Sequence, residues 1–176
     1  MMQPIPLAYF ITINCYGQCL HGDDGGSVDR SHNMYGTTFL PPKPERQRAE
    51  QELMDQPPYE MDHERRKIVL TAIQEVCVFR HWGLVALHIR PSHIHSVVHA
   101  EMNPEKLMNN FKTYASRKLN NAGFENNERK RWARHGSTRY LWKIEDVELA
   151  IHYTLHEQGN PMEIYQSHIL FPESGA

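Results

Sequence analysis

Two histidines separated by a single residue, His93 and His95, are the side chains of this 176-residue chain that best fit a metal-dependent chemistry. The run from His93 to Ala100 is rich in β-branched residues and predicts a strand. Side chains at i and i+2 of a strand project from one face, about 6–7 Å apart. Imidazole is a common ligand of divalent metals, so the pair indicates a metal site. The spacing alone also fits an ordinary pair of surface histidines.

A second candidate group lies near the C-terminus, where residues 145–158 predict a helix that ends before Gly159 and Pro161. Its apolar side is formed by Val147, Ile151 and Thr154 or Leu155, which turns Tyr153 away from the core. A phenol has a pKa of about 10 and attacks phosphorus only with help from a metal or a nearby base. Tyr153 is therefore a candidate nucleophile, with simple packing as the alternative.

Three kinds of protein use a His-x-His strand in this way. A histidine-triad nucleotide hydrolase needs a third histidine where Val97 stands, and a cupin needs more strands than this chain predicts. The third kind is an HUH nuclease, in which a histidine-hydrophobic-histidine strand shares its metal with a tyrosine-bearing helix. The pattern favours this third kind. A metal-dependent phosphohydrolase that uses His93, His95 and His99 remains the alternative from another class.

The predicted elements follow the order strand, helix, strand, strand, helix, strand, helix. This order is typical of an α+β fold, and we expect a ferredoxin-like antiparallel sheet with helices on one face. We expect one domain over residues 1–176, with a long insertion at about 17–62 in which residues 45–54 add a short helix. The predicted elements are a strand at 7–16, a helix at 62–80, a hairpin at 84–90 and 93–100, a helix at 103–121, a strand at 137–142 and the helix at 145–158.

Composition and charge narrow the class of protein. The mean hydropathy is -0.64 and the chain contains no apolar run long enough to span a membrane, so we expect no membrane partner. The N-terminus lacks the pattern of a secretory signal, and the three cysteines form no disulfide framework, which together predict a cytoplasmic protein. The net charge of -2 is uneven: residues 22–62 are acidic, whereas residues 101–145 contain ten basic and five acidic side chains. A polyanion is expected to bind the basic part.

The chain resembles the single-tyrosine HUH transposases of the smallest insertion sequences, the insertion-sequence-200-like transposases, and the REP-associated tyrosine transposases (RAYTs). The resemblance lies in YFITINCYG, GLVALHIRPSHIHSVVHA, NNFKTYASRKLN, GSTRYLW and AIHYTLHEQGNPM, which occur in family order over most of the chain. The insertion adds the segment LHGDDGGSVDR, which looks like a subgroup feature. The resemblance implies the HUH nuclease and transposase fold.

The resemblance also implies an activity, namely metal-dependent cleavage and rejoining of single-stranded DNA. Tyr153 would form a 5′-phosphotyrosine link, and His93 and His95 would hold Mg²⁺ or Mn²⁺. The family often places a glutamine one turn after the tyrosine as the third ligand. On an ideal helix Glu157 lies about 40° from Tyr153 and Gln158 about 140° away, so we prefer Glu157 and name both. A domesticated DNA-hairpin-binding protein with little catalysis is the alternative within the family.

Single-stranded or hairpin DNA is the expected partner. Basic side chains would neutralise phosphates and aromatic faces would stack on unpaired bases. Members of the family act as dimers or monomers, so a homodimer and a monomer both stay open. The candidate DNA-binding residues are Lys112, Arg117, Lys118, Arg131, Trp132, Arg134 and Arg139, of which Arg139 in GSTRYLW matches a family motif.

Overall fold

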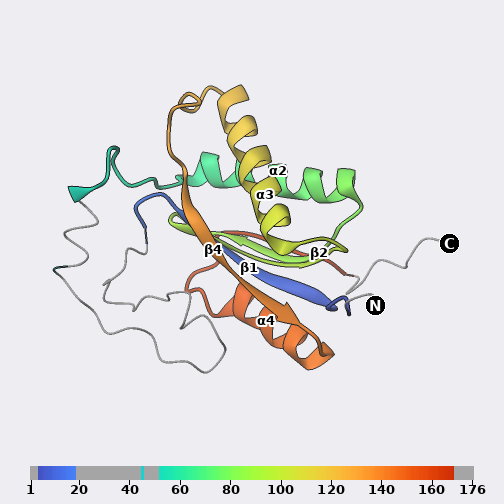
Figure 1. Cartoon of the computed structure of the whole chain (residues 1–176). Coiled ribbons are helices and arrows are strands. Elements are labelled where there is room, and N and C mark those ends of the chain that lie inside the picture. Colours follow the sequence, from blue (N-terminus) through green and yellow to red (C-terminus); the bar gives the residue numbers. More distant parts are fainter. Residues whose placement is uncertain (1–3, 19–44, 46–51, 169–176) are drawn as a thin grey trace.

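A computed structural model describes residues 4–18, 45 and 52–168 of the chain. Most of the predicted insertion at 17–62, and most of its expected helix at 45–54, lies outside the described residues. Figure 1 shows one central sheet between helices. The elements are β1 (Ala8–Cys15), α2 (His63–Arg80), β2 (Gly83–Ile89), β3 (His93–His99), α3 (Pro104–Asn121), β4 (Trp132–Leu141), α4 (Ile144–His156) and β5 (Glu163–Gln166).

The sheet has five strands in the order β4-β1-β3-β2-β5, and every neighbouring pair is antiparallel. The first four strands follow the order of a ferredoxin-like sheet, and the α+β class with an antiparallel sheet is confirmed. β3 lies at the centre, where Thr12 of β1 pairs with His95 on one side and His88 of β2 pairs with it on the other. The predicted His-x-His strand is therefore held between two others.

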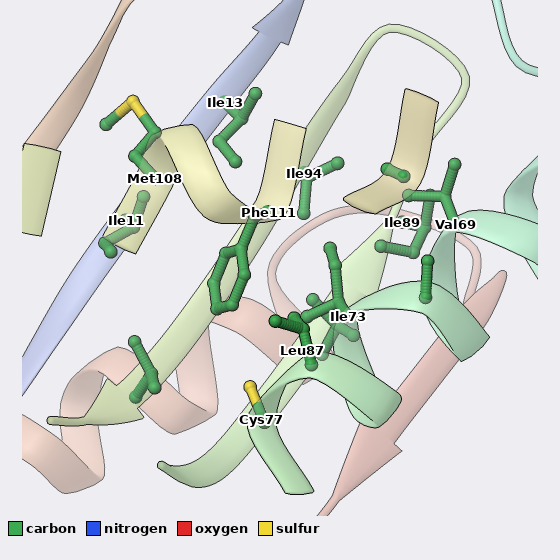
Figure 2. Close-up of a cluster of buried hydrophobic side chains, with 14 of the residues drawn as sticks. Ile11, Ile13, Val69, Ile73, Cys77, Leu87, Ile89, Ile94, Met108 and Phe111 are labelled. Atoms are coloured by element: carbon green, nitrogen blue, oxygen red, sulfur yellow. The ribbon is translucent and has the colours of Figure 1, made fainter. Parts of the chain in front are cut away.

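Both long helices begin at caps that the sequence encodes. The Asp62 side chain accepts a hydrogen bond from Arg65 N at 2.9 Å, and Asn103 accepts from Glu105 N at 2.9 Å, with Pro104 at the first helical position. The two helices pack on the same face of the sheet (Figure 1). Figure 2 shows Phe111 of α3 and Ile73 of α2 in the core that they form with Ile11, Ile94 and Leu87 of the sheet.

The predicted placement of all helices on one face is wrong for α4. Figure 1 shows this helix on the opposite face of the sheet from α2 and α3. There Val147, Ala150 and Leu155 pack in one cluster with Val97 and Leu141. An apolar stripe on a helix shows that this side of the helix is buried, but it does not show against which face of the sheet. Both faces of this sheet have apolar residues on which a helix can pack. The side chains of His93 and His95 belong to this second face.

The two edge strands of the sheet differ from the prediction. β4 begins at Trp132 rather than at 137, and its Gly136 passes so close to β1 that an added Cβ would lie 2.4 Å from the Thr12 carbonyl oxygen. β5 was not predicted, and its four residues pair with β2 from Ala86 to Ile89. Among the described residues no helix is both long and apolar enough to cross a membrane.

Candidate active site

The histidine pair lies at the start of β3, on the face that α4 covers. The ring centroids of His93 and His95 are 4.7 Å apart. The Nδ1 atom of His95 hydrogen bonds with Thr12 Oγ1 at 2.9 Å, and the Nδ1 atom of His93 does so with Ser92 Oγ at 2.9 Å. Each ring is thus oriented through Nδ1, which leaves its Nε2 atom as the nitrogen for a ligand.

Burial keeps both imidazoles neutral. It lowers the pKa of His95 to about 3, and the neighbouring His93 adds to this effect, while a hydrogen bond with the Gln158 side chain opposes it. Burial also lowers the pKa of His93, again against an opposing hydrogen bond with Gln158. A neutral imidazole has the lone pair that metal binding requires, so the pair fits a divalent metal without first losing a proton near neutral pH.

Tyr153 of α4 lies directly beside this pair. Its ring centroid is 5.5 Å from that of His95 and 5.8 Å from that of Phe10, in edge-to-face contacts, and 41% of the residue is exposed. Phe10 in turn stacks on His95 at 5.4 Å. The tyrosine is fixed by ring packing, and its hydroxyl makes no hydrogen bond to any described residue. The sequence-predicted nucleophile and histidine pair are therefore brought together.

The two candidates for a third ligand lie in different surroundings. Glu157 turns to solvent, where its Oε1 atom is 3.0 Å from His152 Nδ1. Gln158 lies against both histidines, and its Nε2 atom donates to the Tyr153 carbonyl at 3.3 Å. The preference for Glu157 assumed an ideal helix, whereas α4 ends at His156. Of the two side chains, Gln158 is the one that lies at the histidine pair.

The described residues contain no group of three or more His, Cys, Asp and Glu side chains that could hold a metal ion. Gln158, an amide, is the third side chain at the pair and supplies a neutral oxygen. The histidine of the alternative phosphohydrolase triad, His99, bonds through Nδ1 to the Leu7 carbonyl at 2.8 Å, at the other end of β3. The side chains gathered at the pair that could bind a metal are thus two imidazoles and one amide.

Sequence analysis missed His88 of β2, which is fully buried next to His95 in the strand register. Its Nδ1 donates to the Thr154 carbonyl at 2.8 Å, and its Nε2 accepts from Met162 N at 3.3 Å. Both ring nitrogens are therefore used within the protein. The signal that could have found this residue is a polar side chain within the otherwise apolar run of β2.

Several candidate DNA-binding residues are engaged within the fold. Arg131 is 3% exposed and bonds to Asn120, the Phe124 carbonyl and Glu125, which leaves its guanidinium no surface for a phosphate. Lys112 Nζ donates to the Ala133 carbonyl at 2.9 Å, and burial lowers its pKa. The Trp132 indole donates to Ser116 Oγ at 2.8 Å and to the Lys112 carbonyl.

The remaining basic candidates reach the surface. Arg117 and Arg134 are exposed, and Lys118 forms an ion pair with Glu75 of α2. Arg139 lies in β4 opposite Phe10 and 3.5 Å from Asp146 of α4. Residues that pair across two strands project from the same face, so Arg139 lies on the face on which Phe10 contacts Tyr153.

A protein family and a solved structure are similar to this chain. The family model described as "Transposase IS200 like" matches residues 59–145. A solved structure described as "Structure of the REP associates tyrosine transposase bound to a REP hairpin" is similar over 89% of this chain and 69% of that chain, with 12% sequence identity and a TM-score of 0.48. No curated protein matches the sequence.

Proposed function

Because the family model of IS200-like transposases matches residues 59–145 of the chain, we propose that it cuts and rejoins single-stranded DNA with Tyr153 as the nucleophile. The observation that carries this proposal is the packing of the Tyr153 ring on His95, 5.5 Å between centroids, beside a second neutral histidine. A phenol next to a metal-binding pair is the arrangement that phosphoryl transfer needs.

Tyr153 Oη attacks a backbone phosphorus as its proton leaves to solvent. The bond from that phosphorus to the 3′ oxygen breaks, the 3′ oxygen takes up a proton, and the 5′ phosphate stays on the tyrosine. A 3′ hydroxyl then attacks this ester in reverse, releases Tyr153 and joins the strands. One ester replaces another at each step, so the reaction uses no nucleotide energy source.

The chain's own residues hold the reacting groups. Phe10 and His95 keep the tyrosine ring over the pair, and Thr12 and Ser92 orient the two imidazoles. His93, His95 and Gln158 would hold Mg²⁺ or Mn²⁺, which supplies charge neutralisation and polarises the phosphate when bound. Glu157, which faces His152, is the weaker candidate for that role.

The DNA would follow the edge of the sheet at β4. Arg134 of β4 and Arg117 of α3 offer exposed side chains for phosphates. Arg139 is half-buried and 3.5 Å from Asp146, so a phosphate would have to compete with that carboxylate for its guanidinium. Tyr140 and Trp142, which stack 6.1 Å apart and are each about half exposed, offer faces for unpaired bases. Affinity for DNA should therefore fall steeply with salt.

The test is a covalent adduct assay. The full chain and its Tyr153→Phe variant are incubated with labelled single-stranded DNA from the flanks of its gene, with Mn²⁺ or with EDTA, and resolved on a denaturing gel. We expect an adduct only with Mn²⁺ and the wild-type chain, and a loss of about a thousandfold or more in the variant. The phenylalanine ring keeps the packing on Phe10 and His95. The melting temperature of the variant is therefore the control, and an unchanged value shows that the variant is folded.

Other outcomes point to the two alternatives. Equal, salt-sensitive hairpin binding by both proteins without an adduct would identify a DNA-hairpin-binding protein with little catalysis. Metal-dependent hydrolysis of small phosphate esters that is indifferent to Tyr153→Phe would instead identify a phosphohydrolase.

A further inference from the structure

The end of α4 is set by a side chain from another element. In a helix that continued, the Thr154 carbonyl would accept from the backbone amide four residues later, which belongs to Gln158. Here the carbonyl accepts from His88 Nδ1 at 2.8 Å instead. Because this carbonyl is satisfied from the sheet, the chain can leave the helical path after His156.

The turn that follows is held at two more points. Met162 N donates to His88 Nε2 at 3.3 Å, and Arg90, the residue after β2 ends, donates to the Asn160 carbonyl at 2.6 Å. Gly159 in this turn has a φ of +77°, the left-handed backbone that favours glycine. The side chains of His88 and Arg90, two residues apart, therefore hold the segment 154–162 at Thr154, Asn160 and Met162.

This turn determines where Gln158 points. On an ideal extension of α4 the Gln158 side chain would lie about 140° from Tyr153, away from the pair. After the early helix end it contacts both His93 and His95. His88 cannot serve as a metal ligand itself, because both of its nitrogens are already bonded.

We propose that His88 is a positioning residue: it ends α4 at the Thr154 carbonyl and so swings Gln158 onto His93 and His95 to complete the metal site. This inference rests on the proposed function. An unbonded buried imidazole is costly, so the two hydrogen bonds are also the reason that a polar ring is tolerated inside β2.

The experiment measures Mn²⁺ affinity of the full chain by titration calorimetry. His88→Phe keeps a ring of similar size and removes both hydrogen bonds, and we expect it to weaken Mn²⁺ binding about tenfold. His88→Asn places an amide N–H where Nδ1 stands, retains the bond to Thr154 and should stay within about threefold of wild type. This rescue also covers the case in which His88→Phe fails to fold.

A double-mutant cycle separates positioning from general destabilisation. The cycle compares His88→Phe, Gln158→Ala and the double variant that carries both changes. If His88 acts through Gln158, the double variant should lose no more Mn²⁺ affinity than Gln158→Ala alone. Ile73→Ala, in the core on the opposite face, is the matched control: it lowers stability and should leave Mn²⁺ affinity unchanged.

Two failures are distinguishable. No difference in Mn²⁺ binding between wild type and a His93→Ala, His95→Ala variant would overturn the proposed metal site. Normal wild-type binding that His88→Phe leaves unchanged, or losses from His88→Phe and Gln158→Ala that simply add, would overturn the positioning role alone.

Discussion

The two faces of the sheet use their residues differently. Two 18-residue helices, α2 and α3, close one face over a mainly apolar core with Phe111 and Ile73 at its centre (Figure 2). A single 13-residue helix, α4, covers the other face with a smaller apolar cluster and stops beside the histidines. Burial on the first face stabilises the sheet, which allows the second face to hold polar rings in fixed positions.

The polar rings that could take part in chemistry lie on the face that α4 covers. On the α4 face the imidazoles of His88 and His95 are buried, yet each has a hydrogen-bond partner. Partnered buried polar groups of this kind define geometry rather than add stability. Substitutions on the two faces should therefore separate folding from metal binding.

The largest effect should come from the core of the first face. Phe111→Ala removes a fully buried ring and should lower the free energy of unfolding by about 3–5 kcal/mol. Urea titration followed by circular dichroism measures this change. Tyr114→Ala, one turn away at a half-buried position, is the control and should cost less. An equal loss for both would contradict the stabilising role of complete burial at the centre of this face.

A substitution on the second face should instead weaken metal binding and change the free energy of unfolding only slightly. Thr12→Val keeps the shape of the side chain but removes the hydrogen bond to His95 Nδ1, and should weaken Mn²⁺ binding about tenfold. Its free energy of unfolding should change by about 1 kcal/mol. Thr71→Val, a matched change whose hydroxyl bonds to the Lys67 carbonyl on α2, should leave Mn²⁺ affinity as it is. Equal Mn²⁺ affinities for the two variants would remove the orienting role of Thr12.

The smallest effect is expected at the edge where β5 meets α2. Burial opposes ionisation of Glu163, but hydrogen bonds from Arg66 and His63 outweigh it, so the net pKa of Glu163 is lowered. A lowered pKa in the folded state stabilises the fold above the pKa of about 4.3 in the unfolded chain, and this contribution is lost as the pH falls through the folded value.

Glu163→Gln should therefore cost about 1 kcal/mol or less at pH 7, and the difference from wild type should shrink in acid. Free energies of unfolding measured from pH 7 down to pH 3 check this trend. Glu64→Gln, an exposed carboxylate at the start of α2, is the control. A difference that grows in acid would have the wrong sign for a lowered pKa.

Local signals in the sequence predicted most elements well. Asp62 and Pro104 marked the starts of α2 and α3, and the alternation from His93 onwards placed both imidazoles on one face of β3. These features depend on residues close together in the chain. β5 was missed because its four residues form no apolar run and become a strand only by pairing with β2.

The surroundings of the candidate site residues could not be predicted for the same reason. Ideal helical geometry favoured Glu157, but α4 ends at His156, where the Thr154 carbonyl bonds to His88 from far away in sequence. Charge counting favoured Arg131 as a DNA-binding residue, but its guanidinium bonds to Asn120 and Glu125, which come from a neighbouring helix end and loop. In both cases a tertiary contact decides what surrounds the side chain, and composition and spacing do not contain that contact.

The attachment of the 154–162 turn to a short edge strand has a consequence for local opening. β5 is four residues long and pairs on one side only, so its amides should exchange with solvent at a lower free energy than those of β1 and β3. An opening that also breaks the bonds of His88 to Met162 and Thr154 would carry Gln158 away from the histidines while the rest of the sheet stays intact. Mn²⁺ binding should then slow exchange in β5 before any other strand, because the ion favours the closed form by mass action.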